Sequence, residues 1–179
     1  MSDEEKLLIG ARGFDEDALA AIYDKYSPGL YRYAYRRCGD RSKAEDCVAE
    51  TFRRFLDTLS KGSGPRIHLQ AYLYRTAHNW LTDSYRREPP PEEEFTDKLK
   101  SFENVNLDEN VDTAAQNKRV RTAVEKLTQD QKQVIILKFL EGFSNKEIAE
   151  TMQKPIGAVK ALQSRGLASL RKILQNAKN

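Results

Sequence analysis

The chain has 179 residues, of which 32% are charged and 39% are apolar, and its net charge is +3. No apolar run approaches the ~20 residues that a membrane-spanning helix needs, and the N-terminus is acidic where a secretory signal would be basic. We therefore expect a cytoplasmic protein with no insertion into the membrane.

Charge is distributed unevenly along the sequence. Residues 1–87 carry 15 basic and 13 acidic side chains, residues 88–112 carry 2 and 9, and residues 113–179 carry 13 and 5. The net charges of these segments are therefore +2, −7 and +8. This division predicts two modules, residues 1–88 and 113–179, joined by an acidic linker over residues 89–112.

The first module is predicted to be helical throughout. Its apolar residues recur at spacings of three and four, which places each set on one face of a helix. The sets are Ala18, Leu19, Ile22 and Tyr26, and then Val48, Phe52, Phe55, Leu56 and Leu59. We assign helix starts to Asp40 and to the pair Ser27-Pro28, because short polar residues cap helices and proline suits the first turn.

A glycine-rich loop follows, and a further helix is predicted from about His68 to Arg87. This helix interleaves aromatic residues with polar and basic ones: Tyr72, Tyr74, Trp80 and Tyr85 with Arg75, His78, Asn79, Arg86 and Arg87. Aromatic faces beside cations suit unstacked single-stranded bases, where stacking contributes about 1–3 kcal/mol per base. Trp80 also shares a stripe with Leu73 and Leu81, so a core position is favoured for it over a stacking role.

The acidic segment begins with three consecutive prolines after Glu88. Prolines cannot continue a helix, and the polar, like-charged remainder has too few apolar residues for a core. We interpret residues 89–112 as an extended linker. A plain solvated spacer fits the same composition.

The second module has clear helix boundaries. Thr128 with Gln131 and Ser144 with Glu147 form two capping boxes, and Gly142 is a stop between them. A third helix follows Pro155 and is strongly basic. Two short helices joined by a tight turn, the second one basic, predict a helix-turn-helix.

The last helix should bury one side and present the other to the major groove of DNA. Val159, Leu162 and Leu170 would be buried. Basic side chains can pair with guanine edges or phosphates, and alanine methyls permit close approach to the bases. The outward residues are Ala158, Lys160, Ala161, Ser164 and Arg165. The alternative is a helical hairpin that packs on another protein.

Catalytic and metal sites find no support in the sequence. Cys38 and Cys47 lie nine residues apart, and the two histidines, His68 and His78, stand apart from them. There is no glycine-rich phosphate loop, no zinc-protease motif and no nucleophile with a base. We expect no catalytic residues, no metal and no cofactor, and two small thiols that are buried or half-buried on helices.

The order of these segments resembles the sigma-70 family of transcription initiation factors, extracytoplasmic-function type, over nearly the whole chain. Residues 44–52 resemble the segment of that family that binds the clamp helices of RNA polymerase. Ala49 stands where glutamine is usual. The resemblance implies polymerase contacts from Asp46, Glu50, Thr51 and Phe52.

Residues 72–87 resemble the family's helix that engages the −10 promoter element, and the loop before it would help to capture flipped bases. The implied −10 contacts are Lys61, Arg66, Tyr72, Arg75, His78, Asn79, Arg86 and Arg87. Residues 127–170 are similar to the −35-binding module, with Gln153 in the turn where glycine is frequent. The implied −35 contacts are Lys154, Ala158, Lys160, Ala161, Ser164 and Arg165.

The resemblance implies an all-α protein with a region 2 helical bundle and a region 4 helix-turn-helix. Such a protein binds core RNA polymerase, directs it to promoters and promotes DNA melting, with its acidic linker in the basic cleft of the enzyme. It also implies an anti-sigma factor as a partner. Two alternatives stay open: a stand-alone regulator that binds duplex DNA, and a helical adaptor with no nucleic-acid role.

Overall fold

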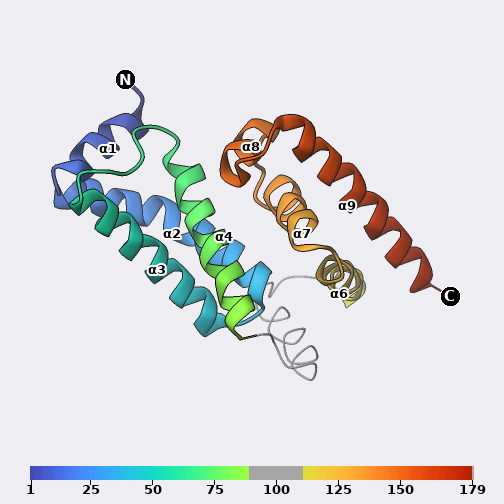
Figure 1. Cartoon of the computed structure of the whole chain (residues 1–179). Coiled ribbons are helices and arrows are strands. Elements are labelled where there is room, and N and C mark those ends of the chain that lie inside the picture. Colours follow the sequence, from blue (N-terminus) through green and yellow to red (C-terminus); the bar gives the residue numbers. More distant parts are fainter. Residues whose placement is uncertain (89–110, 179) are drawn as a thin grey trace. The chain divides into compact units, whose positions relative to one another are not determined.

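The computed structural model describes residues 1–88 and 111–178 (Figure 1). Every regular element in these ranges is a helix, which confirms the all-α expectation. The predicted linker falls largely on residues 89–110, which lie outside the described residues. Helix α6 begins at Val111, two residues before the predicted start of the second module.

The chain divides into two compact units. The helices of the first unit are α1 (Asp3–Arg12), α2 (Glu16–Cys38), α3 (Arg41–Ser60) and α4 (Leu69–Arg87). The described elements of the second unit are α6 (Val111–Glu125), α7 (Gln129–Ile135), the π-helical turn η2 (Ile136–Leu140), most of α8 (Asn145–Met152), and α9 (Ile156–Asn176). None of the helices in the described ranges is both long and apolar enough to cross a membrane.

Polar residues cap most of the helix starts. Asp40 accepts a hydrogen bond from the N–H of Lys43 at 2.7 Å, which confirms the predicted start of α3. Thr128 and Ser144 begin α7 and α8 with the two predicted capping boxes. Each cap satisfies backbone N–H groups that have no partner inside the helix.

The predicted helix start at Ser27-Pro28 is wrong. Pro28 lies inside α2, and the helix instead begins after Asp15, whose side chain caps it. A proline inside a helix removes one backbone hydrogen bond and crowds the preceding turn. Buried side chains on both sides of the proline continue one packed face and offset this cost. They are Ile22, Tyr26, Leu30 and Tyr33.

The core of the first unit lies between α2, α3 and α4, and α1 packs on α2 (Figure 1). The later apolar set predicted for α3 is buried, with one exception. Leu56 keeps 39% of its surface exposed, because it lies on the outer side of the helix. The most deeply buried large side chains here include Tyr33, Phe55, Leu73 and Leu81.

In the second unit α9 packs along α7 and α6. Val124, Leu127 and Ile135 form a buried cluster against which Leu170 of α9 packs. A Cβ atom at Gly166 would lie only 3.1 Å from Cγ1 of Ile135, so the glycine permits the close approach of α9 to α7. This packing holds α9 by one side and leaves its other side outward.

Candidate polymerase and nucleic-acid interfaces

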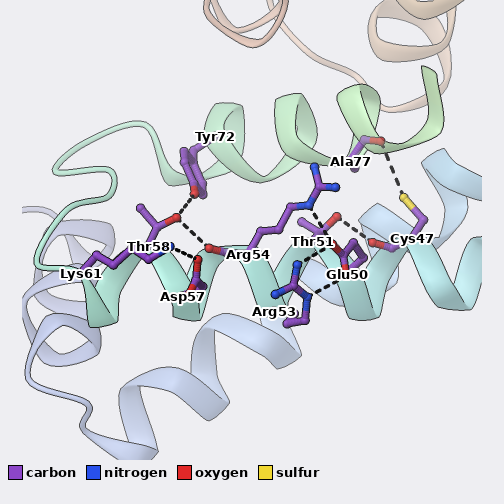
Figure 2. Close-up of polar contacts among 10 residues, drawn as sticks. All are labelled: Cys47, Glu50, Thr51, Arg53, Arg54, Asp57, Thr58, Lys61, Tyr72 and Ala77. Atoms are coloured by element: carbon purple, nitrogen blue, oxygen red, sulfur yellow. Dashed lines mark hydrogen bonds and ion pairs between the residues drawn. The ribbon is translucent and has the colours of Figure 1, made fainter. Parts of the chain in front are cut away.

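Glu50 in the middle of α3 is held by two arginines of the same helix. Its Oε1 accepts hydrogen bonds from Arg53 Nη2 and Arg54 Nε, both at 2.8 Å, and its Oε2 accepts one from Arg53 Nε at 2.8 Å. Hydrogen bonds from Arg53 and then from Arg54 lower the pKa of Glu50 to about 2. Figure 2 shows the three side chains together along α3. Glu50 is therefore an ionised carboxylate with a fixed orientation near neutral pH.

The four predicted polymerase-binding residues divide into two groups. Asp46 is exposed and Glu50 is partly exposed. Thr51 is fully buried and donates a hydrogen bond from Oγ1 to the carbonyl of Cys47 at 2.7 Å. Phe52 is 8% exposed, so it packs inside the unit. The two carboxylates are thus available to a partner, whereas Thr51 and Phe52 position the helix that carries them.

Two side-chain hydrogen bonds drawn in Figure 2 join α3 to α4. The hydroxyl of Tyr72 donates to Thr58 Oγ1 at 3.1 Å, and Thr58 donates in turn to the carbonyl of Arg54 at 2.7 Å. Further along, Cys47 Sγ donates to the carbonyl of Ala77 at 3.8 Å. Burial raises the pKa of Cys47 to about 12, so this thiol is a protonated donor. The prediction of buried cysteines is confirmed.

One face of α4 carries aromatic and polar groups. Tyr72, Arg75, Asn79 and Arg86 are separated by three, four and seven residues, which places them on one side of the helix. The guanidinium of Arg75 lies 6.0 Å from the centre of the Tyr72 ring. Asn79 and Arg86 are exposed, and the other two are half-buried. We call these four residues the α4 face; Arg87, also exposed, lies beside its end.

His78, one of the predicted −10 contacts, is half-buried and lies outside the α4 face. Its Nδ1 lies 2.9 Å from Arg37 Nη1 and 3.5 Å from the hydroxyl of Tyr33. A guanidinium can only donate, so Nδ1 of His78 is an acceptor and its ring faces α2. Arg37 itself is 1% exposed, and no apolar periodicity in the sequence indicated this buried cation.

Lys61 and Arg66 lie in the loop between α3 and α4, and both are exposed. Lys61 Nζ pairs with Asp57 Oδ2 at 2.8 Å. Gly62 and Gly64 have φ angles of +71° and +109°, which other residues rarely adopt. The glycines of the predicted loop therefore shape its turn.

Half of the tyrosines of the first unit belong to its core. Tyr26, Tyr33, Tyr35 and Tyr74 are buried. Trp80 is half-buried at the edge of the core, whereas Leu81 beside it is fully buried. Tyr72 is thus the tyrosine of α4 that combines partial exposure with a neighbouring cation on the α4 face.

The predicted helix-turn-helix is confirmed in α8, the turn and α9. Gln153 ends α8 in the left-handed region, with φ +53° and ψ +45°. Gln163 Nε2 donates to Asn145 Oδ1 at 2.7 Å and joins α9 to the start of α8. Neither polar partner was singled out from the sequence. Val159 is fully buried, whereas Leu162 and Leu170 are half-buried.

The predicted −35 residues differ in exposure. Lys160, Ser164 and Arg165 are exposed, and Ala158 and Ala161 are half-buried beside them. Lys154 is half-buried, and its Nζ lies 3.6 Å from Asp130 Oδ2. The outward side of α9 thus presents two cations, a hydroxyl and two small methyl groups, as the sequence pattern predicted.

No group of three or more histidine, cysteine, aspartate or glutamate side chains suited to a metal ion occurs in the described ranges. The exposed and half-buried side chains of α3, α4 and α9 instead offer hydrogen-bond donors, carboxylates and, on α4, aromatic rings. Hydrogen-bond donors and aromatic rings are groups with which proteins contact nucleic acids.

Two protein-family models match this chain. The model of sigma-70 region 2 matches residues 22–89, and the model of sigma-70 region 4 matches residues 117–170. The first match spans most of α2 and all of α3 and α4. The second begins inside α6 and ends inside α9, so it includes α7, η2, α8 and the turn of the helix-turn-helix.

Several curated relatives are similar over almost the whole chain. The ECF RNA polymerase sigma factor BldN of Streptomyces coelicolor is 31% identical over 171 residues, which are 94% of this chain and 65% of BldN. The chain therefore spans just under two thirds of the length of BldN. SigW of Bacillus subtilis, also an ECF RNA polymerase sigma factor, is 30% identical over 172 residues, 90% of this chain and 91% of SigW.

Two solved structures share the fold. The structure of CnrH in complex with the cytosolic domain of CnrY has a TM-score of 0.74 at 21% identity. The match covers 96% of this chain and 97% of the chain in that structure. The sigma factor RpoE of Bartonella quintana, solved with the anti-sigma factor NepR, has a TM-score of 0.64 at 20% identity. The match covers 87% of this chain and 96% of the RpoE chain. From the family models and the relatives, the chain belongs to the extracytoplasmic-function sigma factors of the sigma-70 family.

Proposed function

We propose that this sigma factor binds core RNA polymerase, directs it to promoters through contacts to a duplex −35 element and a melted −10 element, and promotes strand opening. The observation that carries the proposal is the pairing of two different surfaces on one chain. One is the outward side of α9, and the other is the α4 face. Their chemistry suits two different forms of DNA.

The outward side of α9 suits duplex DNA. A recognition helix enters the major groove and needs cations for phosphates or guanine, with small side chains where the helix comes close to the bases. Lys160 and Arg165 supply the cations, and Ala158 and Ala161 supply the small groups. Burial of Val159 on the opposite side fixes the helix for this role.

The α4 face suits unpaired bases. A base that leaves the stack is stabilised by an aromatic ring and by hydrogen bonds to its edges. Tyr72 supplies a ring beside the Arg75 guanidinium, and Asn79 supplies an amide with both donors and an acceptor. Lys61 and Arg66 in the neighbouring loop would neutralise phosphates of the separated strand.

Polymerase binding is assigned to the outward surface of α3. Asp46 and the oriented carboxylate of Glu50 are acceptors that a basic partner surface could pair with. Because Glu50 already accepts from two arginines, it presents a mixed charge pattern instead of an isolated negative charge. Such a pattern favours specificity over affinity.

An anti-sigma factor is also part of the proposal, since the RpoE structure with the similar fold contains one. Exposed apolar side chains on the first unit, such as Tyr23 at 48% and Leu56 at 39%, would be covered by such a partner. Co-purification of the tagged chain from its host would test this point.

The deciding experiment is run-off transcription with purified core polymerase on a library of promoters, preceded by a pull-down of core enzyme. We expect core polymerase to bind the chain and to start transcripts at a defined set of sites. The free protein should bind promoter duplex poorly, because each unit is small and polymerase is needed to hold both at promoter spacing. Tight operator binding by the free protein, without polymerase binding, would favour a stand-alone regulator and contradict the proposal.

A further inference from the structure

Helix α1 holds the loop between α3 and α4 at two points. Arg12 Nη2 donates a hydrogen bond to the carbonyl of Pro65 at 2.6 Å. Glu4 Oε1 accepts a hydrogen bond from the backbone N–H of Leu69 at 3.1 Å. These partners lie 53 and 65 residues apart in sequence, so only the tertiary fold brings them together.

Glu4 acts as the cap that α4 does not have in its own sequence. His68, at the N-cap position, has φ +57° and makes no side-chain capping bond. The first N–H groups of a helix lack partners within it, and the helix dipole favours a negative charge there. The Glu4 carboxylate supplies both the acceptor and the charge. The hydroxyl of Tyr26 donates to its other oxygen at 3.1 Å and fixes its orientation.

The loop is thus anchored on both sides. Its first half rests on α3, because the N–H and the hydroxyl of Ser63 both donate to the carbonyl of Thr58 at 3.1 Å. Its second half, from Pro65 to the start of α4, is held by Arg12 and Glu4. Between these anchors the side chains of Arg66, Ile67 and His68 point outward, and Ile67 is 56% exposed.

We infer that α1 is a positioning element of the −10 site: Glu4 and Arg12 hold the loop and the first turn of α4 in the conformation that captures unpaired bases. Neither residue lies within the part of the chain matched by the region 2 model, which begins at residue 22. The inference rests on the proposed function of the loop and the α4 face. A preorganised site loses less conformational freedom on binding, so releasing the loop should weaken capture without affecting duplex recognition.

The test uses the full chain with core polymerase and compares Glu4→Ala and Arg12→Ala with the natural protein. A template with a pre-melted −10 region, carrying a fluorescent base analogue, reports capture of unpaired bases. A duplex −35 probe reports recruitment. We expect each variant to lose about tenfold in affinity for the pre-melted template, since each loses a hydrogen bond to a charged group. Recruitment to the duplex should change less than about twofold.

Matched controls come from the same helix. Asp3→Ala and Lys6→Ala remove the same charges from exposed positions of α1, where the two side chains pair with each other at 3.5 Å. The conservative variants Glu4→Gln and Arg12→Lys keep an acceptor and a donor and should recover part of the loss. Amide hydrogen exchange of Leu69 gives a readout that needs no DNA, and it should accelerate in Glu4→Ala while thermal unfolding shows the unit still folded.

The outcomes separate the two proposals. If the natural protein opens promoters and binds the pre-melted template while Glu4→Ala and Arg12→Ala behave like the controls, the role of α1 is overturned and the proposed function stands. If the natural protein with polymerase does not bind the pre-melted template, the proposed function fails, and the inference about α1 fails with it.

Discussion

The two units of this sigma factor bury and expose different kinds of side chain. All eight tyrosines and the single tryptophan lie in the first unit, whereas residues 113–179 contain none of them and carry a net charge of +8. The first unit is nearly neutral and joins its helices through buried and half-buried polar contacts such as Tyr72 to Thr58. Unpaired bases stack on aromatic rings, whereas proteins contact duplex DNA through cations and small side chains. The side chains of the first unit therefore suit unpaired bases, and those of the second unit suit duplex DNA.

The largest expected effect is on the stability of the first unit. Phe55 is 1% exposed, and its ring centre lies 6.0 Å from that of Tyr72. Phe55→Ala should lower the free energy of unfolding of this unit by about 3–5 kcal/mol, because it removes buried apolar area and leaves a cavity. Urea unfolding followed by tyrosine and tryptophan fluorescence would measure the change in the first unit alone.

The control for this prediction is Leu56→Ala, at a neighbouring position that is 39% exposed. Leu56→Ala should lower the free energy of unfolding of the first unit far less than Phe55→Ala does. Far-UV circular dichroism, to which both units contribute, would show whether the second unit unfolds at its original urea concentration. A common shift of both units would contradict an effect that is confined to the first unit.

The second prediction separates duplex reading from strand opening. Lys160→Ala and Arg165→Ala should each weaken recruitment to duplex promoter by about 1–3 kcal/mol if the side chain pairs with guanine. If the side chain contacts a phosphate instead, the slope of log affinity against log salt concentration should become smaller in magnitude by about one. Asn79→Ala should leave recruitment nearly unchanged and reduce opening of the −10 region. Gel shifts and permanganate footprinting report the two steps.

Lys172 provides a matched control for these variants, because it is exposed on the same helix but twelve residues after Lys160. Lys172→Ala should change recruitment less than Lys160→Ala. Equal defects in both steps from the α9 variants and from Asn79→Ala would contradict the division of tasks between the units.

The third prediction concerns pH and the first unit. The pKa of Glu50 is lowered from 4.5 to about 2, so its contribution to stability is complete above pH 4.5 and is lost as the pH falls toward 2. Glu50→Gln should therefore be less stable than the natural protein by at most about 1 kcal/mol near neutral pH, because the pairs are partly exposed. This difference should shrink between pH 4.5 and 2.

Urea unfolding from pH 6 down to the lowest pH at which the unit still folds would measure this trend. Glu45→Gln is the control, since Glu45 on the same helix is more exposed and pairs only with Arg41, at 3.5 Å, in the contacts described for it. A Glu50→Gln deficit that does not change with pH would show that the lost stability comes from packing and not from ionisation.

The smallest expected effect lies in the turn of the second unit. Gln153 holds a left-handed backbone conformation that glycine adopts without strain. Gln153→Gly should raise the free energy of unfolding of this unit by a net amount of about 0.5–1 kcal/mol. This value is what is left after the relief of strain is offset in part by the larger conformational entropy of glycine in the unfolded chain. Gln153→Ala keeps a Cβ atom and should give no such gain. Thermal unfolding of the three proteins would decide, and a loss with glycine would contradict the strain argument.

The sequence by itself determined much of this protein, because the relevant signals are local. Capping boxes at Thr128 and Ser144, the cap at Asp40 and the glycines of the loop depend on residues within a few positions, and each is where the pattern placed it. Helical spacing likewise predicted the outward side of α9. The resemblance to a family named the same two regions, region 2 and region 4, that the family models match.

Only the tertiary structure decided which of the singled-out residues of the first unit face outward. His78 lies in a basic, aromatic stretch of sequence, yet its ring accepts from the buried Arg37 of α2, and Thr51 is buried where a partner contact was expected. Pro28 is carried inside α2 because packing on both sides of it offsets the lost hydrogen bond. Glu4 reaches the first turn of α4 across 65 residues. Such contacts depend on distant segments, so no local pattern in the sequence can report them.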